Sequence, residues 1–265
     1  METTANKIEE KLVLSKKEFI SIFEIIYACD DGKNLLTKDK PMLQYLHIER
    51  DIAETCDGYR LSRRKLPIVL DKKYLLHRKD IKEVLKQVRK SKENINVIFN
   101  EDNVEINNNE FNIVVKSNNE LNFPNLNSLI NSDLDELKNK FILIKKDFKE
   151  LMKRLQKIGF LKFYSSDNDE IIFEYFNIDK EYKEEKVISC DNIKGNLDLT
   201  AINGKFLKPV LNSYKDSEKI FLFNNKNVQP LYFTNEKRTK LDVLLPIRIN
   251  KLIDIKGWFY WMYMI

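Results

Sequence analysis

The stretch Cys56-Asp57-Gly58-Tyr59-Arg60-Leu61 decides how this sequence is interpreted. One apolar run, Leu43 to Ile48, precedes it, and a second, Leu66 to Leu70, follows it. Asp57-Gly58 therefore indicates a tight turn between two strands, because glycine adopts backbone conformations that residues with a side chain resist. Another apolar run, Leu244-Leu245-Pro246-Ile247-Arg248-Ile249, lies far away in the sequence. The two stretches together set the interpretation of the rest of the chain.

The composition is that of a folded protein with a mild positive charge. The chain has 265 residues, 43% of them hydrophobic, and this length accommodates two ordinary domains. The formal net charge of +5 suits a nucleic-acid partner, although many proteins without one have a similar charge. The distribution of charge along the chain must therefore decide whether a nucleic-acid partner is expected.

Cysteine spacing and the N-terminal sequence indicate the compartment. Cys29, Cys56 and Cys190 lie far apart, which argues against a disulfide framework or a zinc site and fits a reducing cytosol. The segment Met1 to Glu10 is polar where a signal peptide needs an apolar core, and no apolar run reaches the ~18 residues of a membrane span. We expect a cytoplasmic protein without a membrane partner.

Four amphipathic helices are expected at intervals of roughly 60 residues, which indicates an internal repeat. Their apolar faces are anchored by Phe19, Ile81, Phe148 and Phe206. Further apolar residues at helical spacing complete one hydrophobic face on each helix. A helix with a single apolar stripe covers one face of a sheet, so each of these helices needs strands beside it.

Short strands with polar turns separate these helices. Hairpins are expected around Asn107-Asn108-Asn109, Ser165-Ser166-Asp167-Asn168 and Asn224-Asn225. Each repeat is thus one helix with several antiparallel strands, and two repeats close into a layered domain. The expected fold class is α+β, with two similar domains that each pack two helices on antiparallel sheets. We place the domains at 1–132 and 133–250, followed by an aromatic C-terminal tail at 251–265.

Basic residues gather on the helices. They outnumber acidic residues on the second, third and fourth helices and balance them on the first. On the second and third helices they lie opposite the apolar stripe. A solvated lysine-rich face is one interpretation and a phosphate-facing surface is the other, which the match between two repeats favours. The candidate DNA-facing residues are Lys79, Lys82, Lys86, Arg89, Lys146, Lys149, Lys153, Lys157, Lys205 and Lys208.

Several motifs, in their order and spacing, resemble the second and third domains of the bacterial DNA polymerase III β sliding clamp. The resemblance spans about Leu12 to Ile249 and lacks the usual first domain. Cys56 to Leu61 resembles the family segment T-D-G-H-R-L, with Cys in place of Thr and Tyr in place of His. Phe123 to Leu126 resembles F-P-D-Y, and Phe206 to Tyr214 resembles the family's last helix. Val243 to Ile249 resembles the closing V-x-M-P-M-R-L.

This resemblance implies a fold and a function. Clamps of this family form rings of six similar domains, whose helices line a central hole around duplex DNA. Two domains per chain imply a DNA clamp fold and a homotrimeric ring. The implied function is that of a DNA polymerase processivity factor, which binds double-stranded DNA without reading its sequence. Polymerases and clamp loaders are the implied peptide partners, and a phage, plasmid or other mobile element is a candidate source.

The resemblance also implies a hydrophobic pocket that captures short peptides from partner proteins. Apolar and aromatic residues with two arginines at the rim have the composition of a small anchor pocket. The alternative is that the apolar members are ordinary core residues of strands. Ser128 stands where the family often has arginine, which puts partner preference in doubt. The pocket residues implied are Leu43, Cys56, Gly58, Tyr59, Arg60, Leu61, Pro124, Leu129, Val243, Leu245, Pro246, Ile247, Arg248 and Ile249.

The chain continues beyond the point where a family member would end. Gly257 to Ile265 contains both tryptophans of the sequence. Nine residues are too few to span a bilayer, and so much aromatic surface is costly to leave in water. The tail is expected either to dock on a clamp surface or to complete the second core as an extra strand or helix.

The sequence offers no catalytic or metal-binding constellation. His47 and His77 are its only histidines, and neither has metal-ligand spacing with another His or Cys. Asp167, Asp169 and Glu170 fall in an expected hairpin turn, where a solvated loop is the commoner explanation. Phosphate-binding glycine loops and nucleophile motifs are also missing. We therefore expect no enzyme activity, no cofactor and no metal.

Two other functions stay open at this point. The first is a non-encircling clamp-like interaction module, a monomer or dimer that binds or competes for replication proteins. The second is a nuclease or another DNA-modifying enzyme. For the enzyme, Asp57 beside Arg60 is the pair to consider, but no second convergent group accompanies it.

Overall fold

The chain folds into two compact units, Met1–Leu126 (unit 1) and Asn127–Ile265 (unit 2), each with its own hydrophobic core. The computed structural model describes residues 10–29, 38–130, 133–155, 160–177, 182–226 and 229–247. The domain boundary that we predicted, after residue 132, lies a few residues beyond the division between the units. The predicted aromatic tail at 251–265 lies outside the described residues.

Unit 1 contains a four-stranded antiparallel sheet in the order β1-β4-β5-β6. These strands are β1 (Glu10–Leu14), β4 (Ile95–Phe99), β5 (Asn103–Asn107) and β6 (Asn112–Lys116). Buried and less buried residues alternate along β4 and β5, because successive side chains of a strand point to opposite faces. One face of the sheet therefore closes the core of unit 1. The predicted hairpin around Asn107-Asn108-Asn109 is confirmed as the β5–β6 pair.

The Asp57-Gly58 turn joins two strands that are much longer than the apolar runs beside it predict. These are β2 (Tyr45–Cys56) and β3 (Arg60–His77), paired antiparallel. Their register shifts on both sides of Arg50, whose φ of 54° is unusual for a residue with a side chain. Strand β2 begins within the apolar run Leu43 to Ile48 and not at its first residue. Pro41–Gln44 forms a 3₁₀ turn instead, with the proline at its first position, where the ring already has a helical φ.

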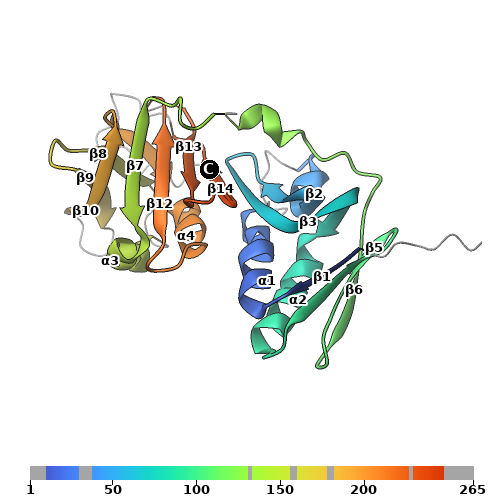
Figure 1. Cartoon of the computed structure of the whole chain (residues 1–265). Helices are drawn as coiled ribbons and strands as arrows, with labels where there is room; N and C mark the ends of the chain where they lie inside the picture. The colour runs from blue at the N-terminus through green and yellow to red at the C-terminus, as the bar shows by residue number, and fades with distance from the viewer. Residues whose placement is uncertain are drawn as a thin grey trace, which may run out of the picture. The chain divides into compact units, whose positions relative to one another are not determined.

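Two helices of unit 1 lie side by side (Figure 1). Helix α1 (Lys16–Phe23) is capped by Ser15. The Ser15 hydroxyl accepts a hydrogen bond from the Glu18 amide, and the Glu18 carboxylate accepts one from the Ser15 amide. A 3₁₀ turn, η1 (Glu24–Ala28), extends it, and α2 (Arg78–Lys90) follows β3. The predicted helix faces are confirmed, because the apolar residues that anchor them are buried, Phe19, Ile22 and Phe23 on α1 and Ile81, Val84, Leu85 and Val88 on α2.

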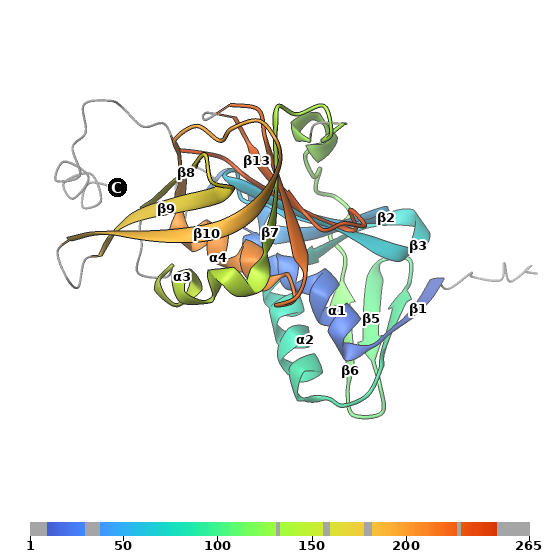
Figure 2. The same ribbon diagram turned by 60° about the vertical axis from the view of Figure 1, so that its left-hand side comes forward.

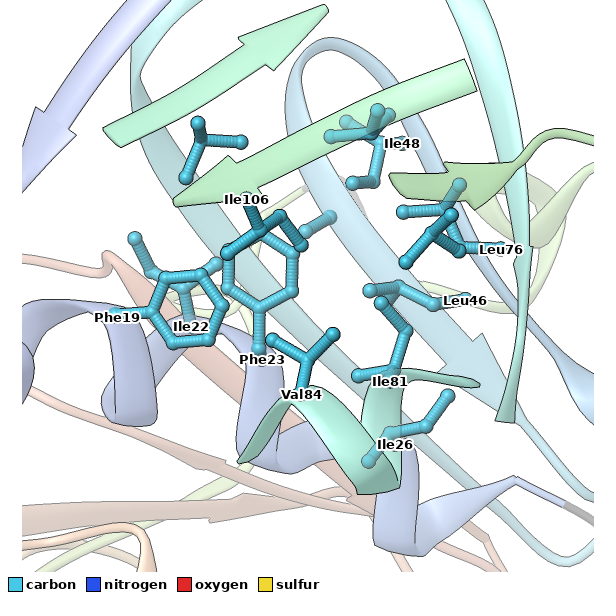
Figure 3. Packing of buried hydrophobic residues seen from close by; sticks show 14 of the residues in the cluster. Phe19, Ile22, Phe23, Ile26, Leu46, Ile48, Leu76, Ile81, Val84 and Ile106 are labelled. Atoms are coloured by element: carbon cyan, nitrogen blue, oxygen red, sulfur yellow. The ribbon is translucent and has the colours of Figure 1, made fainter. Parts of the chain in front are cut away.

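The core of unit 1 forms between these helices and the strands (Figure 3). Phe19 and Phe23 of α1 stack with ring centroids 4.2 Å apart. Ile81 and Val84 of α2 lie on the same side as these rings and point toward the strands. All four side chains are fully buried, so the helices are held in place by their apolar faces.

The first strand of unit 2, β7 (Asn139–Ile144), lies in the middle of the unit's strand ladder. On one side of β7 lie the strands that follow the second helix of the unit, and on the other side lie the strands between its two helices. The first group, in spatial order, is β12 (Lys219–Asn224), β13 (Leu231–Thr234) and β14 (Lys240–Leu244). The second, in spatial order, is β10 (Tyr182–Lys194), β9 (Glu170–Asn177), β8 (Phe160–Ser165) and β11 (Thr200–Asn203). The predicted hairpins β8–β9 and β12–β13 are thereby confirmed.

Both helices of unit 2 are shorter than α2 of unit 1 (Figure 2). The third predicted helix starts as a 3₁₀ turn, η5 (Lys145–Phe148), and continues as α3 (Lys149–Arg154). Helix α4 (Gly204–Asn212) is capped by the Asn203 side chain and contains Pro209, which removes one backbone donor. Apolar residues of α3 and α4 enter one core with the strands of unit 2.

The two units share a topology. In unit 1 the order β1-β4-β5-β6 joins the first strand to the three strands that follow the second helix. In unit 2 the order β7-β12-β13-β14 joins the corresponding strands. Each unit also has a helix directly after its first strand and a second helix directly before the last three strands. The predicted α+β fold, with two similar domains of two helices on antiparallel sheets, is confirmed.

Candidate functional site

The turn of the β2–β3 hairpin is held by a single carboxylate. Asp57 Oδ1 accepts hydrogen bonds of 3.0 Å from the amides of Tyr59 and Arg60, and Oδ2 accepts one of 2.8 Å from Arg60 Nε. Gly58 between them has a φ of 88°, which favours glycine. Arg60 also donates through Nη2 to the carbonyl of Tyr27 at 3.0 Å. Asp57 and Arg60 therefore fix the turn and tie it to η1.

The structure places the first group of predicted pocket residues on or near this hairpin of unit 1. Leu43, Cys56 and Leu61 are at most 6% exposed, so these side chains are packed into the unit. Cys56 and Leu61 face each other in the ladder next to the turn. The remaining members reach the surface to a greater degree. Tyr59 and Arg60 are half-buried, and Gly58 and Pro124 are exposed.

The second group lies in unit 2. Val243 is buried in β14, whereas Leu245 is 43% exposed directly after that strand. Ile247 donates its amide to the carbonyl of Ala201 in β11 at 2.7 Å, which holds the segment after β14 against the edge of the ladder. Leu129, in the 3₁₀ turn η4 (Leu126–Leu129), is 60% exposed. Pro246 is half-buried, and Arg248 and Ile249 lie outside the described residues.

Sequence reasoning missed a buried ionic network behind the same hairpin. Glu54 Oε1 lies 3.1 Å from His47 Nδ1, and its Oε2 accepts a hydrogen bond of 2.8 Å from Arg63 Nε. Burial alone would raise the pKa of Glu54, but the hydrogen bond from His47 and the charge of Arg63 outweigh it and lower the pKa. Phe123 stacks on the His47 ring at 4.7 Å. The available sequence signal was the facing pair Glu54 and Arg63, because strand partners of opposite charge attract.

The cysteines do not resemble catalytic thiols. Burial raises the pKa of Cys29 and of Cys56 to about 12, and that of Cys190 to about 11. A thiol with such a pKa is protonated at neutral pH, whereas the thiolate is the nucleophile. Within the described residues there is no group of three His, Cys, Asp or Glu side chains that could hold a metal ion.

No helix in the described part of the chain combines the length and the apolar character that crossing a membrane requires.

The basic face of α2 is the best-defined charged surface of unit 1. Lys79, Lys86 and Arg89 are exposed, as predicted, and Lys82 is half-buried. Lys86 Nζ forms an ion pair of 2.7 Å with Glu83 one turn earlier on α2. The apolar residues of α2 are fully buried on the opposite face. The helix therefore presents its cations to solvent over its exposed length.

Tyr27 of η1 lies among these cations, and sequence reasoning did not single it out. Lys82 Nζ is 5.1 Å from the centre of the Tyr27 ring, and Arg89 Cζ is 5.5 Å from it. Arg89 Nη1 also donates a hydrogen bond of 2.9 Å to the Tyr27 hydroxyl, and Arg89 Nη2 lies 3.5 Å from Glu24. Tyr27 follows buried Ile25 and Ile26 in an apolar run, a pattern that is typical of core packing.

Unit 2 presents a second set of cations. Lys146, Lys149 and Lys153 are exposed on η5 and α3, and Lys153 pairs with Glu150 at 2.7 Å. On α4, Lys205 is exposed and Lys208 is half-buried. Lys157 lies outside the described residues. The predicted basic positions that are described thus reach the surface of their own units to different degrees.

Comparison with known proteins gives a likeness in structure. No family model matches the sequence, and no curated protein matches it. The sliding clamp of Bacillus subtilis aligns over 94% of this chain and 67% of its own, with a TM-score of 0.73 and 16% identity. The DNA polymerase III β subunit of Borrelia burgdorferi aligns over 94% and 65%, with a TM-score of 0.74 and 14% identity.

The sliding clamp of Pseudomonas aeruginosa aligns over 90% of this chain and 66% of its own, with a TM-score of 0.72 and 14% identity. The chain thus spans about two thirds of the length of these clamps. The predicted resemblance is confirmed at the level of structure. The chain has the α+β fold of the bacterial DNA polymerase III β sliding clamps.

Proposed function

We propose that this protein is a sliding-clamp-like processivity factor, which encircles duplex DNA and tethers a polymerase to it. The observation that supports this most strongly is the likeness to sliding clamps over more than nine tenths of the chain. The cations on α2, α3 and α4 add chemical support, because lysines and arginines on helices contact phosphates without reading bases. A clamp that slides needs contacts of this sequence-independent kind.

The proposed assembly is a ring of three chains. Each chain has two units of one topology, and six such units make the ring that clamps of this family form. Within the sheet of unit 1, β6 is an edge strand, with Val114 60% exposed on it. Unpaired edge strands tend to pair with other chains, and closed symmetry satisfies every such edge. The ring therefore gives these edges a partner.

The proposed partners besides DNA are apolar peptides of polymerases and clamp loaders. The hairpin turn of unit 1 offers Tyr59 and Arg60 at a half-buried position that Asp57 fixes. The segment after β14 in unit 2 offers exposed Leu245, held by the bond from Ile247 to Ala201. Rigid aromatic, arginine and aliphatic groups of this kind are typical anchors for peptides. Each group is preorganised within its own unit.

Retention on circular DNA tests the encircling function. The full chain is loaded onto nicked circular DNA, with a clamp loader if loading requires one, and passed over a sizing column before and after the DNA is linearised. A ring stays with the circle and slides off the linear ends. Equal retention on both forms would contradict encirclement. Light scattering at micromolar concentration should give a mass near three chains, whereas a persistent monomer would identify the non-encircling module instead.

A matched pair of variants tests which surface faces the DNA. Lys79→Ala with Lys86→Ala removes two cations from α2, and Lys65→Ala with Lys72→Ala removes two exposed cations from β3. Only the α2 variant should weaken binding to duplex DNA and reduce the slope of log affinity against log salt, by about one for each phosphate that the variant no longer neutralises. An equal loss of affinity in both variants would contradict the proposed surface.

A further inference from the structure

We infer that Tyr27 is a positioning residue for DNA, which holds Lys82 and Arg89 of α2 in place as phosphate ligands. This inference rests on the proposed function, because the phosphates belong to the duplex that the clamp would encircle. The ring of Tyr27 is within cation–π distance of both side chains, at 5.1 Å from Lys82 Nζ and 5.5 Å from Arg89 Cζ. One aromatic residue thus contacts two cations that lie two turns apart on α2.

The anchoring of Tyr27 makes it suitable for this task. Tyr27 is half-buried and packs against the core of unit 1, so the ring itself has a fixed position. Its carbonyl accepts a hydrogen bond from Arg60 at 3.0 Å, and its hydroxyl accepts one from Arg89 at 2.9 Å. A ring that packs against the core, on a residue whose backbone is anchored by Arg60, can restrict the rotamers of long side chains that lie on it. Lysine and arginine otherwise lose much conformational entropy when they bind a ligand.

The chemistry around Tyr27 favours phosphates over bases. Single-stranded nucleic acids stack their bases on exposed aromatic rings. Here Lys82 and Arg89 lie over the ring of Tyr27, so the ring is occupied by cations. Glu24, 3.5 Å from Arg89, balances only part of this charge, and Lys86 stands on the same helix. The cluster therefore suits the backbone of a duplex, which presents phosphates and keeps its bases stacked inside.

Two substitutions separate the ring from the hydroxyl. Tyr27→Leu keeps an apolar side chain against the core and removes the ring, while Tyr27→Phe keeps the ring and removes only the hydrogen bond to Arg89. Affinity of the full chain for a labelled duplex is measured by fluorescence anisotropy at several low salt concentrations. We expect Tyr27→Leu to weaken binding about fivefold, and Tyr27→Phe to weaken it less than about twofold. The salt slope should stay unchanged in both, because no cation is removed.

A double-mutant cycle distinguishes positioning from general damage. Lys82→Ala and Lys79→Ala remove cations from the same helix, but only Lys82 lies over the Tyr27 ring. We expect the loss of affinity caused by Tyr27→Leu to be smaller in the Lys82→Ala background, where only Arg89 still lies over the ring, and to persist in full in the Lys79→Ala background. A reduction in affinity that is the same in both backgrounds would overturn the positioning role.

The outcomes also separate this inference from the function on which it rests. If the unmodified chain binds no duplex at any salt concentration, the proposed function fails, and the role of Tyr27 fails with it. If the unmodified chain binds duplex and Tyr27→Leu binds equally well, only the role of Tyr27 is overturned. Hydrogen exchange of the unit 1 strands verifies that each variant is folded. Should Tyr27→Leu be unfolded, Tyr27→Met, which also removes the ring and keeps a long apolar side chain against the core, replaces it in the same cycle.

Discussion

The two units have one topology, but their cations contact aromatic rings from different kinds of element. In unit 1, Lys82 and Arg89 of α2 lie over an aromatic ring from the neighbouring turn η1. In unit 2, the corresponding contacts belong to strands, because Lys140 of β7 lies 5.3 Å from the ring of Phe223 and Lys240 of β14 lies 5.1 Å from that of Tyr214. The apolar pattern thus determines the shared ladder, while the surface charges diverge between the units.

The cores explain why the topology persists through this divergence. Helix α2 buries Ile81, Val84, Leu85 and Val88, and the shorter α4 buries Leu207, Val210 and Leu211 among others. Both sets repeat at helical spacing, so each helix covers the same kind of sheet. A surface cation contributes little to folding, so its position is free to change. Each prediction below tests how far the two units behave independently.

The largest expected effect comes from removing one aromatic side chain from either core. Phe23 of unit 1 is fully buried against Phe19, and Phe148 of unit 2 packs edge-on against Phe173 at 5.6 Å. Phe23→Ala and Phe148→Ala should each reduce the free energy of unfolding by about 3–5 kcal/mol, because each leaves a cavity. Hydrogen exchange should show reduced protection in β4 to β6 for the first and in β12 to β14 for the second. Equal reduction in both units would mean that they unfold together.

A smaller effect is expected from Glu54, whose buried network is specific to unit 1. Glu54→Gln removes the charge that pairs with Arg63 and His47, and should cost about 2 kcal/mol near neutral pH. The pKa of Glu54 is lowered in the folded state, so its contribution is complete above the ordinary pKa of about 4.3 and is lost as the pH falls through the lowered value.

Urea unfolding of Glu54→Gln and of the unmodified chain, at about pH 7 and about pH 3, measures the contribution of Glu54 to the free energy of unfolding. The difference between Glu54→Gln and the unmodified chain should shrink at the lower pH, because the unfolded chain then binds a proton at Glu54 more readily than the folded chain does. A difference that stays the same at both pH values would show that the network contributes through shape alone. Asp102→Asn, an exposed carboxylate in the β4–β5 turn, serves as the control.

Much of the fold followed from the sequence because periodicity is a local property. The apolar spacing at Ile81, Val84 and Leu85 required a helix, and the Asp57-Gly58 pair required a turn. The lengths of β2 and β3 did not follow. Their middle parts contain charged residues such as Arg64, which is only 3% exposed, and burial of that kind depends on neighbours distant in sequence.

The candidate sites were less accessible to sequence reasoning for the same reason. Lys79 and Lys149 were predicted to be exposed because they lie opposite an apolar stripe, and they are. The position of Tyr27 beside Lys82 and Arg89 depends on how η1 packs against α2, two elements that lie far apart in the sequence. The pocket residues were implied only by family motifs, and they stay a prediction.

The smallest expected effect comes from two matched ion pairs, one in each unit. Lys86 pairs with Glu83 on α2, and Lys153 pairs with Glu150 on α3, both at 2.7 Å and both one turn apart. Glu83→Gln and Glu150→Gln each remove a carboxylate that competes with phosphates for a lysine. If both helices face the duplex, each variant should bind DNA about twofold tighter, with a steeper dependence on salt.

Fluorescence anisotropy of both variants, with Glu120→Gln in an exposed turn as the control, sharpens the comparison between the units. A gain in affinity confined to Glu83→Gln would mean that unit 1 alone contacts DNA, which is incompatible with a ring lined by both units. A gain in neither would place both basic faces away from the duplex. Because Glu120→Gln changes the net charge by the same amount, a gain beyond that of this control shows that the neighbouring lysine meets a phosphate.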